Sequence, residues 1–563
     1  MNKFLLLAAL LAGPGLTQAQ SWQWVAAPTG TGNARVFATA TDATGATVIA
    51  GDFTGTIMLG STTLTSAGNR DVFVARLTSA GAFTQAVRAG GPDEDYAIDL
   101  ALDASGTATV LGGFYSATAE FGSTVLTKVG PPGGAEVFVA QLGSAGTWTR
   151  AIPGGSGGAA FPSTLALDAA GNAVVAGFFY GPSTTFGPTT LANINTTGAN
   201  VSAADIFVAR LSSAGTWTQA VRGGGNGDDR AEGVALAADG TVVVVGSFRG
   251  QTMGLGTFSL VNADPSGQTN DVFVGRLGAA GAWTQAVRAG GAADDQARRL
   301  ALDAAGNATI VGSFDSPAIS FGSFTLTNAN AAGTTSDIFA ARFTPTGTWS
   351  QAVRAGGPGA DRALAVAVSA NGQATVGGLF ASPTASFGNL SLSNADANGF
   401  SLDLFVARLN SEGSAWTQAV RAGAGSDEAV VDLALTNSGE ATIAGLYLST
   451  TTIGSTTLNS TTATDNTGFV ARTTGLPLGV RQAAGTAPLA VYPNPAAAGA
   501  ATLRLATATS VAQPLVLRDA LGRVVRQTTL VAGQQEIQLP TVGLAPGVYL
   551  AEAGLSRVQV VVE

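Results

Sequence analysis

The chain has 563 residues, of which 46% are hydrophobic and only 11% charged, and its formal net charge is −9. It contains no cysteine and no histidine, which excludes disulfides, thiolate metal sites and the usual general base of Ser-His-Asp hydrolases. The acidic balance also argues against nucleic acid as a partner, because no basic surface is available to neutralise phosphates.

The first twenty residues have the pattern of an export signal. Lys3 gives the N-terminus a positive charge, and residues 4–12 form an apolar segment too short to span a bilayer. Thr17 and Ala19 are the small residues at positions −3 and −1 of a cleavage site after Ala19. We therefore expect residues 1–19 to be a signal peptide. No later segment is long and apolar enough to predict a transmembrane span.

A seven-residue motif, DVFVARL at 71–77, returns along the chain at a nearly constant spacing. Its phenylalanine recurs every 64 to 69 residues, at Phe73, Phe138, Phe207, Phe273, Phe339, Phe405 and Phe469. Each repeat holds four apolar segments, A to D, separated by Gly, Asn and Asp turns; in one repeat they are 298–306, 307–314, 337–343 and 349–357. The pattern predicts four antiparallel strands per repeat.

Seven such repeats predict an all-β fold, a seven-bladed β-propeller over residues 20–474 with four-stranded blades. A linear solenoid is the alternative, but the ends of the repeat region favour a closed ring. Residues 21–30 resemble segment D with no A, B or C before it, whereas the last repeat has A, B and C and no D. An N-terminal strand that closes the last blade would leave no open sheet edge.

The stretch at 290–314, with its pattern GG…D…A…LALDAAGNATIVGSF, resembles the seven-bladed β-propeller (SBBP) repeat of exported bacterial proteins. The resemblance covers residues 21–474. It implies the propeller fold, and that family has no single activity to transfer.

The period stops after residue 474, and a linker at 475–487 leads into a tail at 488–563. Alternating apolar segments with Gly and Pro turns predict a small Ig-like β-sandwich there. VYPNP at 491–495, DALGRVV at 519–525, GQQEIQL at 533–539, LAPGVYL at 544–550 and the ending RVQVVV resemble the type A C-terminal sorting domain of the type IX secretion system. That resemblance implies the type IX machinery as partner and delivery to the cell surface or medium. The sorting-signal residues it implies are Tyr492, Pro493, Asn494, Pro495, Gly533, Gly547 and Tyr549.

The tight A–B and C–D turns of a propeller lie on one face, so a ligand is expected on the other, where the longer B–C and D–A connections lie. The D–A connections repeat an acidic residue two positions before a shared alanine: Asp95, Asp229, Asp295, Asp361 and Asp427. These carboxylates could form a ring that holds Ca²⁺ or a cationic or hydroxyl-rich partner. Alternatively, each could cap its own loop by accepting hydrogen bonds from backbone N–H groups.

The third D–A connection has no acidic residue, and this break in the repeat predicts a pocket near Phe161, Phe179 and Tyr180. Overall we expect a monomeric, exported, non-enzymatic propeller that binds a glycan or a surface protein. No cofactor is expected, with Ca²⁺ at the acidic loops as the one candidate, and the residues of any metal site are not identified. The alternative is a carbohydrate-active enzyme, a hydrolase or lyase, that uses carboxylates on the long-connection face.

Overall fold

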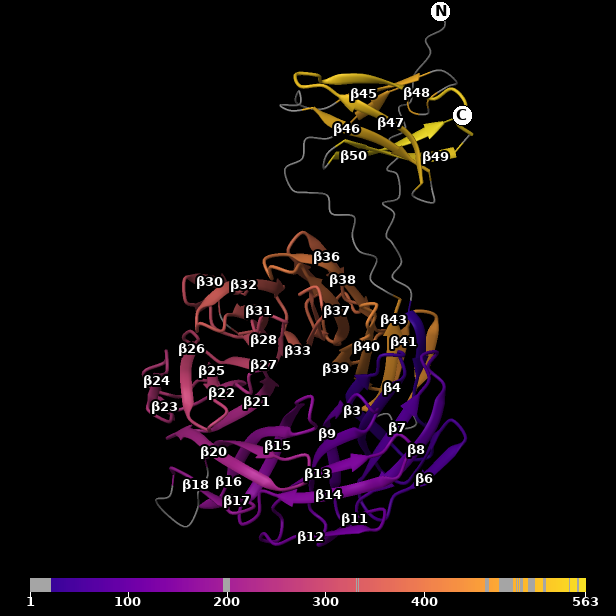
Figure 1. Cartoon of the computed structure of the whole chain (residues 1–563). Coiled ribbons are helices and arrows are strands. Elements are labelled where there is room, and N and C mark those ends of the chain that lie inside the picture. Colours follow the sequence, from indigo (N-terminus) through magenta and orange to yellow (C-terminus); the bar gives the residue numbers. More distant parts are fainter. Residues whose placement is uncertain are drawn as a thin grey trace, which may run out of the picture. The chain divides into compact units, whose positions relative to one another are not determined.

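The computed structural model describes residues 22–474, except 196–202, 331, 333 and 461–464, and residues 490–562, except 493, 495, 497–499, 505–511, 520–522, 546, 554 and 555. The signal peptide predicted at 1–19 and the linker predicted at 475–487 lie outside these residues. The chain divides into two compact units, Met1–Leu476 and Pro477–Glu563. All regular structure described is β, as predicted (Figure 1), and the described residues contain no helix that could span a membrane.

The first unit is built from four-stranded antiparallel sheets that share one strand order. The first sheet runs outward from β3 (Ala34–Thr41) through β4 (Thr47–Phe53) and β7 (Asp71–Leu77) to β8 (Phe83–Ala89). Five further sheets repeat it: β9 (Asp95–Leu102), β10 (Ala108–Phe114), β13 (Glu136–Leu142) and β14 (Trp148–Gly154); β15 (Ala159–Leu167), β16 (Ala173–Tyr180), β19 (Asp205–Leu211) and β20 (Trp217–Gly225); β21 (Asp229–Leu236), β22 (Val242–Phe248), β25 (Asp271–Leu277) and β26 (Trp283–Ala289); β27 (Asp295–Leu302), β28 (Ala308–Phe314), β31 (Asp337–Phe343) and β32 (Trp349–Gly356); β33 (Asp361–Val368), β34 (Ala374–Phe380), β37 (Asp403–Leu409) and β38 (Trp416–Ala422).

The remaining sheet joins the two ends of the repeat region. It consists of β39 (Glu428–Leu435), β40 (Ala441–Tyr447), β43 (Thr467–Thr473) and, outermost, β1 (Trp22–Ala26). Trp24 pairs with Arg472 and Ala26 with Val470. The innermost strands β3, β9, β15, β21, β27, β33 and β39 contact one another in that cyclic order, and β39 contacts β3 (Figure 1). The fold is therefore a β-propeller whose last sheet is closed by the N-terminal strand, as predicted.

Each B–C connection contains a short hairpin that the sequence pattern did not reveal. The hairpins are β5 (Thr56–Leu59) with β6 (Thr62–Thr65), β11 (Thr118–Phe121) with β12 (Thr124–Thr127), β17 (Ser183–Phe186) with β18 (Thr189–Ala192), β23 (Thr252–Leu255) with β24 (Phe258–Val261), β29 (Ala318–Phe321) with β30 (Phe324–Thr327), β35 (Thr384–Phe387) with β36 (Leu390–Ser393), and β41 (Thr450–Ile453) with β42 (Thr456–Asn459).

The hairpin of one blade covers the outer edge of the blade before it. β23 pairs with β20 through Gly225 and Met253, and β35 pairs with β32 through Ala355 and Phe387. At the junction of the last and first blades the same role falls to β2 (Thr29–Gly30), which follows β1 and pairs with β5. The end of each outermost strand thus finds a backbone partner, which limits edge-to-edge aggregation.

The blades adhere through buried aromatic and arginine side chains. The aromatic residues that end the second strand of each blade are at most 2% exposed: Phe53, Phe114, Phe179, Phe248, Phe314, Phe380 and Tyr447. On the outer strands, the indole N–H of Trp217 donates to the carbonyl oxygen of Pro153 in the preceding blade at 2.8 Å. In the third strands, Arg210 Nη2 donates to the Gly240 carbonyl of the following blade at 2.8 Å, and Arg472 does the same to Gly45 across the closing junction.

The second unit has two antiparallel sheets. One contains β44 (Ala490–Tyr492), β45 (Ala500–Arg504) and β48 (Glu536–Pro540), and the other contains β46 (Gln513–Arg518), β47 (Val524–Leu530), β49 (Gly547–Ala553) and β50 (Ser556–Val562). Leu503, Leu517, Tyr549 and Val560 belong to its hydrophobic core. This arrangement agrees with the predicted small β-sandwich.

Candidate ligand-binding site

The acidic residues predicted in the D–A connections begin the inner strands and are buried. Asp95, Asp229, Asp295 and Asp361 are at most 1% exposed. Asp95 Oδ2 accepts hydrogen bonds from Gly91 N at 2.7 Å and from Ser116 Oγ at 2.8 Å. These contacts agree with the loop-capping interpretation, whereas a cation-binding ring would need carboxylates that solvent can reach.

The alignment was wrong by one residue in the last repeat. Asp95 lies opposite Phe114 in its sheet, and the residue that lies opposite the equivalent Tyr447 is Glu428. Asp427 instead accepts a hydrogen bond from Leu402 N at 3.0 Å. In this repeat Val430 stands where the others have the shared alanine, and the adjacent Ala429 shifts the sequence pattern by one residue.

Each buried acid has a second acid as its neighbour. The third strands begin with Asp71, Asp205, Asp271, Asp337 and Asp403, each 0% exposed and each paired with an arginine of the outermost strand at 2.6–3.1 Å. Burial raises the pKa of Asp295 to about 8, hydrogen bonds from Ser316 oppose the rise, and the charge of Asp271 adds to it. Burial likewise raises the pKa of Asp95 and Asp361 to about 6 and that of Glu428 to about 7. Within the part of the chain that the structure describes, no group of three or more acidic side chains could hold a metal ion.

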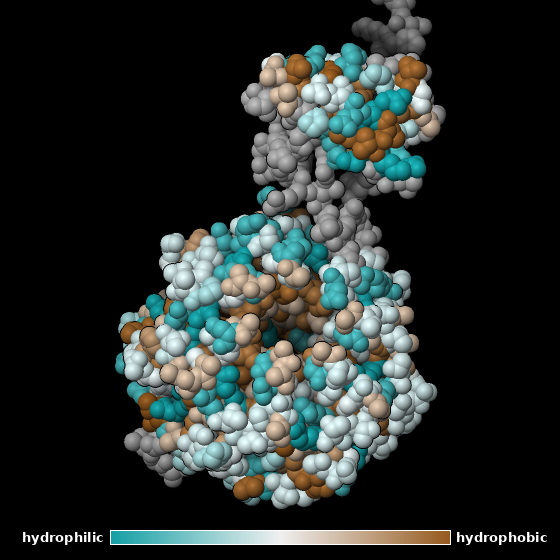
Figure 2. Space-filling view, in the orientation of Figure 1, coloured by the Kyte–Doolittle hydropathy of each residue, from teal (hydrophilic) through white to brown (hydrophobic). Residues whose placement is uncertain are grey.

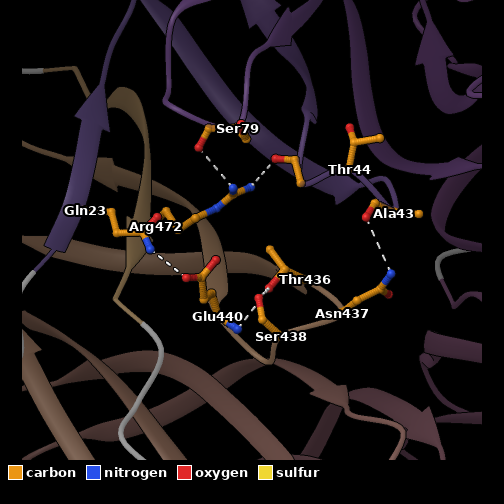
Figure 3. A pocket seen from close by; sticks show the side chains of 10 residues that line it. Gln23, Ala43, Thr44, Ser79, Thr436, Asn437, Ser438, Glu440 and Arg472 are labelled. Carbon is orange, nitrogen blue, oxygen red and sulfur yellow. Dashed lines mark hydrogen bonds between the residues drawn. The ribbon is translucent and has the colours of Figure 1, made fainter.

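Crevices on the tight-turn face lie between neighbouring blades. Three of them have volumes of about 420, 240 and 440 Å³. In the first (Figure 3), Gln23 Nε2 donates to Glu440 Oε1 at 2.6 Å, and Arg472 donates to the carbonyl oxygen of Ser79 at 3.2 Å. Because similar crevices recur around the ring and these polar groups are already paired, we interpret the crevices as imperfect packing between blades.

The repeat breaks down at the inner-strand residue one position after Asp95 and its equivalents, which is the second residue of six inner strands and the third of β15. No two blades have the same pair of this residue and its partner on the second strand: Arg35 with Asp52, Tyr96 with Gly113, Phe161 with Phe178, Arg230 with Ser247, Gln296 with Ser313, Arg362 with Leu379, and Ala429 with Leu446. All lie next to the D–A connections, at one end of the central channel, which Figure 2 shows as a hollow in the middle of the ring. We call this end of the channel the mouth.

An aromatic cluster lies at the mouth on β15 and β16. The rings of Phe161 and Phe178 stack with centroids 5.4 Å apart, and Tyr180 meets them edge-on at 6.0 and 5.9 Å. Phe161 and Tyr180 were predicted here, but Phe179 is completely buried and Phe178 takes its place. The difference follows from strand geometry, since successive side chains point to opposite sides.

Arginine side chains gather beside this cluster on the adjacent strands β21, β27 and β33. The guanidinium of Arg230 lies 4.8 Å from the Phe178 ring and donates to Tyr180 Oη at 3.1 Å. Arg298 Nη1 lies 3.6 Å from Glu232 Oε1, and Arg298 Nη2 donates a hydrogen bond to Gln296 Oε1 at 2.7 Å. Burial lowers the pKa of Arg298, the charge of Glu232 raises it, and the nearby charges of Arg362, Arg299 and Arg230 lower it further. Asp228 and Glu232 approach Arg230 and Arg298 at 4.0 and 3.6 Å, and the charge of Arg299 acts on the carboxyl groups of Asp99 and Asp432.

Two carboxylates that the sequence did not single out lie deeper in the channel. Asp99 on β9 accepts a hydrogen bond from Leu165 N at 2.8 Å, and Asp432 on β39 accepts one from Thr39 N at 2.7 Å. Burial raises the pKa of both, to about 7 for Asp432, and the charge of Arg299 opposes the rise. The only signal available in the sequence was an acid where the other repeats carry Ala, Thr, Gly or Arg.

The predicted sorting-signal residues have varied surroundings. Tyr492 is 44% exposed and donates to Glu536 Oε1 at 3.0 Å, whereas Tyr549 is 8% exposed and donates to the Ala545 carbonyl at 2.7 Å. Asn494 Oδ1 accepts a hydrogen bond from Val561 N at 2.8 Å. Gly533 has a positive φ of 86°, and Gly547 begins β49. Pro493 and Pro495 lie outside the described residues.

Residues 490–561 match the family described as the secretion system C-terminal sorting domain. This match shows that the chain is exported by type IX secretion to the cell surface or medium. No curated protein matches the sequence.

Among solved structures, the chain is similar to a polysaccharide lyase described as an ulvan lyase, with 11% identity, 78% of this chain and 93% of the other covered, and a TM-score of 0.37. It is also similar to a mutant of the Synechocystis apocarotenoid oxygenase, with 10% identity, 80% and 94% coverage, and a TM-score of 0.36. Similarity at this level carries no inference about activity.

Proposed function

We propose that this chain is an exported, non-enzymatic binding protein that holds a glycan or a protein at the mouth of its propeller channel. The observation that carries the proposal is the contrast between the uniform blades and the residue pairs at the mouth, no two of which are the same, although arginine occupies the inner-strand position in three blades. Side chains that maintain the fold recur in each repeat, whereas a site for one ligand needs a particular set. The proposal includes SBBP-type repeats, a signal peptide at 1–19 and a linker at 475–487.

Binding is favoured over catalysis by the state of the acidic side chains. The repeated acids at the starts of the first and third strands are buried and accept hydrogen bonds from their own loops or from arginine. The chain also lacks histidine and cysteine, so a general base would have to be a carboxylate, Tyr or Lys. In this proposal the acidic loops shape the binding face, because each buried acid fixes the conformation of its own loop.

The test is a binding screen with the purified full chain on immobilised glycans and on surface proteins of the producing cells. We expect retention on at least one class, and we expect Arg362→Gln together with Phe178→Ala to reduce it. A chain that binds nothing in either set would refute the proposal and leave a purely structural role.

A second function, a carbohydrate-active enzyme, is favoured by one observation. Asp99 and Asp432 both line the channel and both have raised pKa values, and glycoside hydrolysis uses two carboxyl groups in different protonation states. In that case Asp432→Asn would abolish turnover of a polysaccharide while leaving its binding intact. A broad polysaccharide screen without turnover by the unaltered chain would eliminate this function.

The sorting unit is proposed to be recognised by the type IX machinery through its surface. Tyr492 is exposed and fits that role, whereas Tyr549 is buried in the sandwich and maintains its fold.

A further inference from the structure

The mouth of the channel combines two groups that a single ligand could contact together. Phe161 and Phe178 stack on each other, and both rings are partly exposed. Arg230 lies over Phe178 and therefore connects this aromatic pair to the arginines of β27 and β33. Ligand sites commonly pair aromatic surface with a few well-placed polar groups.

The arginines at the mouth differ from those elsewhere in the propeller. On the outermost strands, Arg88 and its equivalents are neutralised by a fully buried aspartate, as in the 2.6 Å pair with Asp71. At the mouth, Arg230 is more exposed than these side chains, at 44% against 28–36%, and Arg298 is exposed to the same extent, at 34%. What distinguishes both is that their acidic neighbours lie further away, at 4.0 and 3.6 Å. Arg362 is exposed. Guanidinium groups so placed are available for bidentate contact with a carboxylate or sulfate.

We propose that the mouth binds an acidic glycan, with a sugar ring against the exposed part of the Phe161 and Phe178 pair and its carboxylate or sulfate on Arg298 and Arg362. This inference rests on the proposed binding function and specifies its ligand class. A long polyanion such as nucleic acid fits less well, because the net charge of the chain is −9 and the arginines beside the aromatic cluster lie on only three neighbouring inner strands. A short acidic segment needs only these few guanidinium groups.

The experiment is isothermal titration calorimetry of the purified full chain with four probes: an oligogalacturonate, a sulfated galactan oligosaccharide, its unsulfated counterpart and an oligoglutamate peptide. We expect the two acidic sugars to bind and to weaken at high salt, because the contacts are charged. Arg298→Gln and Arg362→Gln are each expected to weaken acidic-sugar binding about tenfold, the effect of losing one charged hydrogen bond. The matched control is Arg150→Gln on β14, which removes the same charge from the outermost strand and should leave binding unchanged.

The outcomes separate this inference from the proposed function. If the unaltered chain binds the unsulfated sugar equally well, or if Arg362→Gln has no effect, the ligand class is wrong and the binding function stands. Binding of oligoglutamate alone would replace the glycan with an acidic peptide. Absence of binding to all four probes, together with a failed glycan and protein screen, would overturn both. Arg362 is exposed, so its substitution tests the inference even if Arg298→Gln impairs folding.

Discussion

Arg472 offers the most direct test of how the ring is closed. It lies on β43 and is 2% exposed, and its guanidinium donates to the Gly45 carbonyl at 2.8 Å and to the Ser79 carbonyl at 3.2 Å (Figure 3). It also donates to Thr47 Oγ1 at 2.9 Å. Its Cζ also lies 5.2 Å from the ring of Trp24 on β1. The side chain thus joins the last blade to the first blade and to the N-terminal strand.

The substitution Arg472→Gln would leave two carbonyl oxygens without their charged donor. At about 1.5–3 kcal/mol for each such hydrogen bond, the expected loss in the free energy of unfolding is about 4 kcal/mol. Unfolding entropy is about 2.1 cal/mol/K per residue, so a propeller of roughly 450 residues gains about 1 kcal/mol/K and should melt about 4 °C lower. Differential scanning calorimetry of the full chain measures this shift.

Arg210→Gln is the matched control, because Arg210 makes the equivalent contact to Gly240 at a junction inside the repeat region. Adjacent blades there are also joined by the chain itself, so we expect a smaller shift and unchanged amide exchange in β1. Arg472→Gln should instead accelerate exchange in β1 and β43. Equal shifts for both variants, with β1 equally protected in both, would show that the closing junction has no special role.

Three other perturbations test the packing, the buried acids and the export unit. Trp217→Ala removes a side chain that is 5% exposed, together with its hydrogen bond to Pro153. We expect the free energy of unfolding, measured by urea denaturation, to fall by about 3–5 kcal/mol. A decrease of less than about 1 kcal/mol would contradict the interblade role. The folded chain holds the Asp295 proton up to a pKa of about 8, against 3.8 unperturbed, so unfolding releases that proton and stability should fall as pH rises between these values. Urea midpoints of the unaltered chain should therefore decrease from pH 5 to pH 8, and those of Asp295→Asn should decrease less. A midpoint of the unaltered chain that rises over this pH range would refute the raised pKa of Asp295. A chain that ends at residue 488 lacks the matched region 490–561 and should stay inside the cell envelope in fractionation, whereas its appearance in the medium would show that another segment directs export.

The sequence predicted the propeller well because each blade repeats the same strands, and an unmatched strand at one end complements a missing strand at the other. Hairpins such as β5 with β6 were not predicted, because four-residue strands rich in Thr and Leu resemble polar loops in the sequence. Their pairing depends on the edge of the preceding blade, which no local pattern reveals. The hydrogen bonds of Asp95 could not be assigned from the sequence either, because capping a loop and binding a cation require the same residue type.

The candidate site was harder to predict than the fold because it has no period. Phe161 and Tyr180 were found where one loop lacked its acid, but Arg298 and Arg362 approach each other only because the inner strands β27 and β33 of neighbouring blades are in contact. A shift of one residue, as between Phe178 and Phe179, moves a ring from the interblade core to the mouth. Residues that repeat in every blade are therefore those that maintain the fold. The candidate site consists of residues that differ between blades.

The pairing of β1 with β43 also sets the order in which the chain can finish folding. β1 is among the first strands to be synthesised, yet its partner Arg472 lies almost 450 residues after Trp24. Contacts so distant in sequence form late, because the intervening chain must already be ordered for the ends to meet. Until β43 has been synthesised, the closing strand β1 has no partner, and every shorter nascent chain is an open array of blades. Any truncation within the repeats would leave β1 unpaired, so the chain should become protease-resistant in a single late step rather than blade by blade.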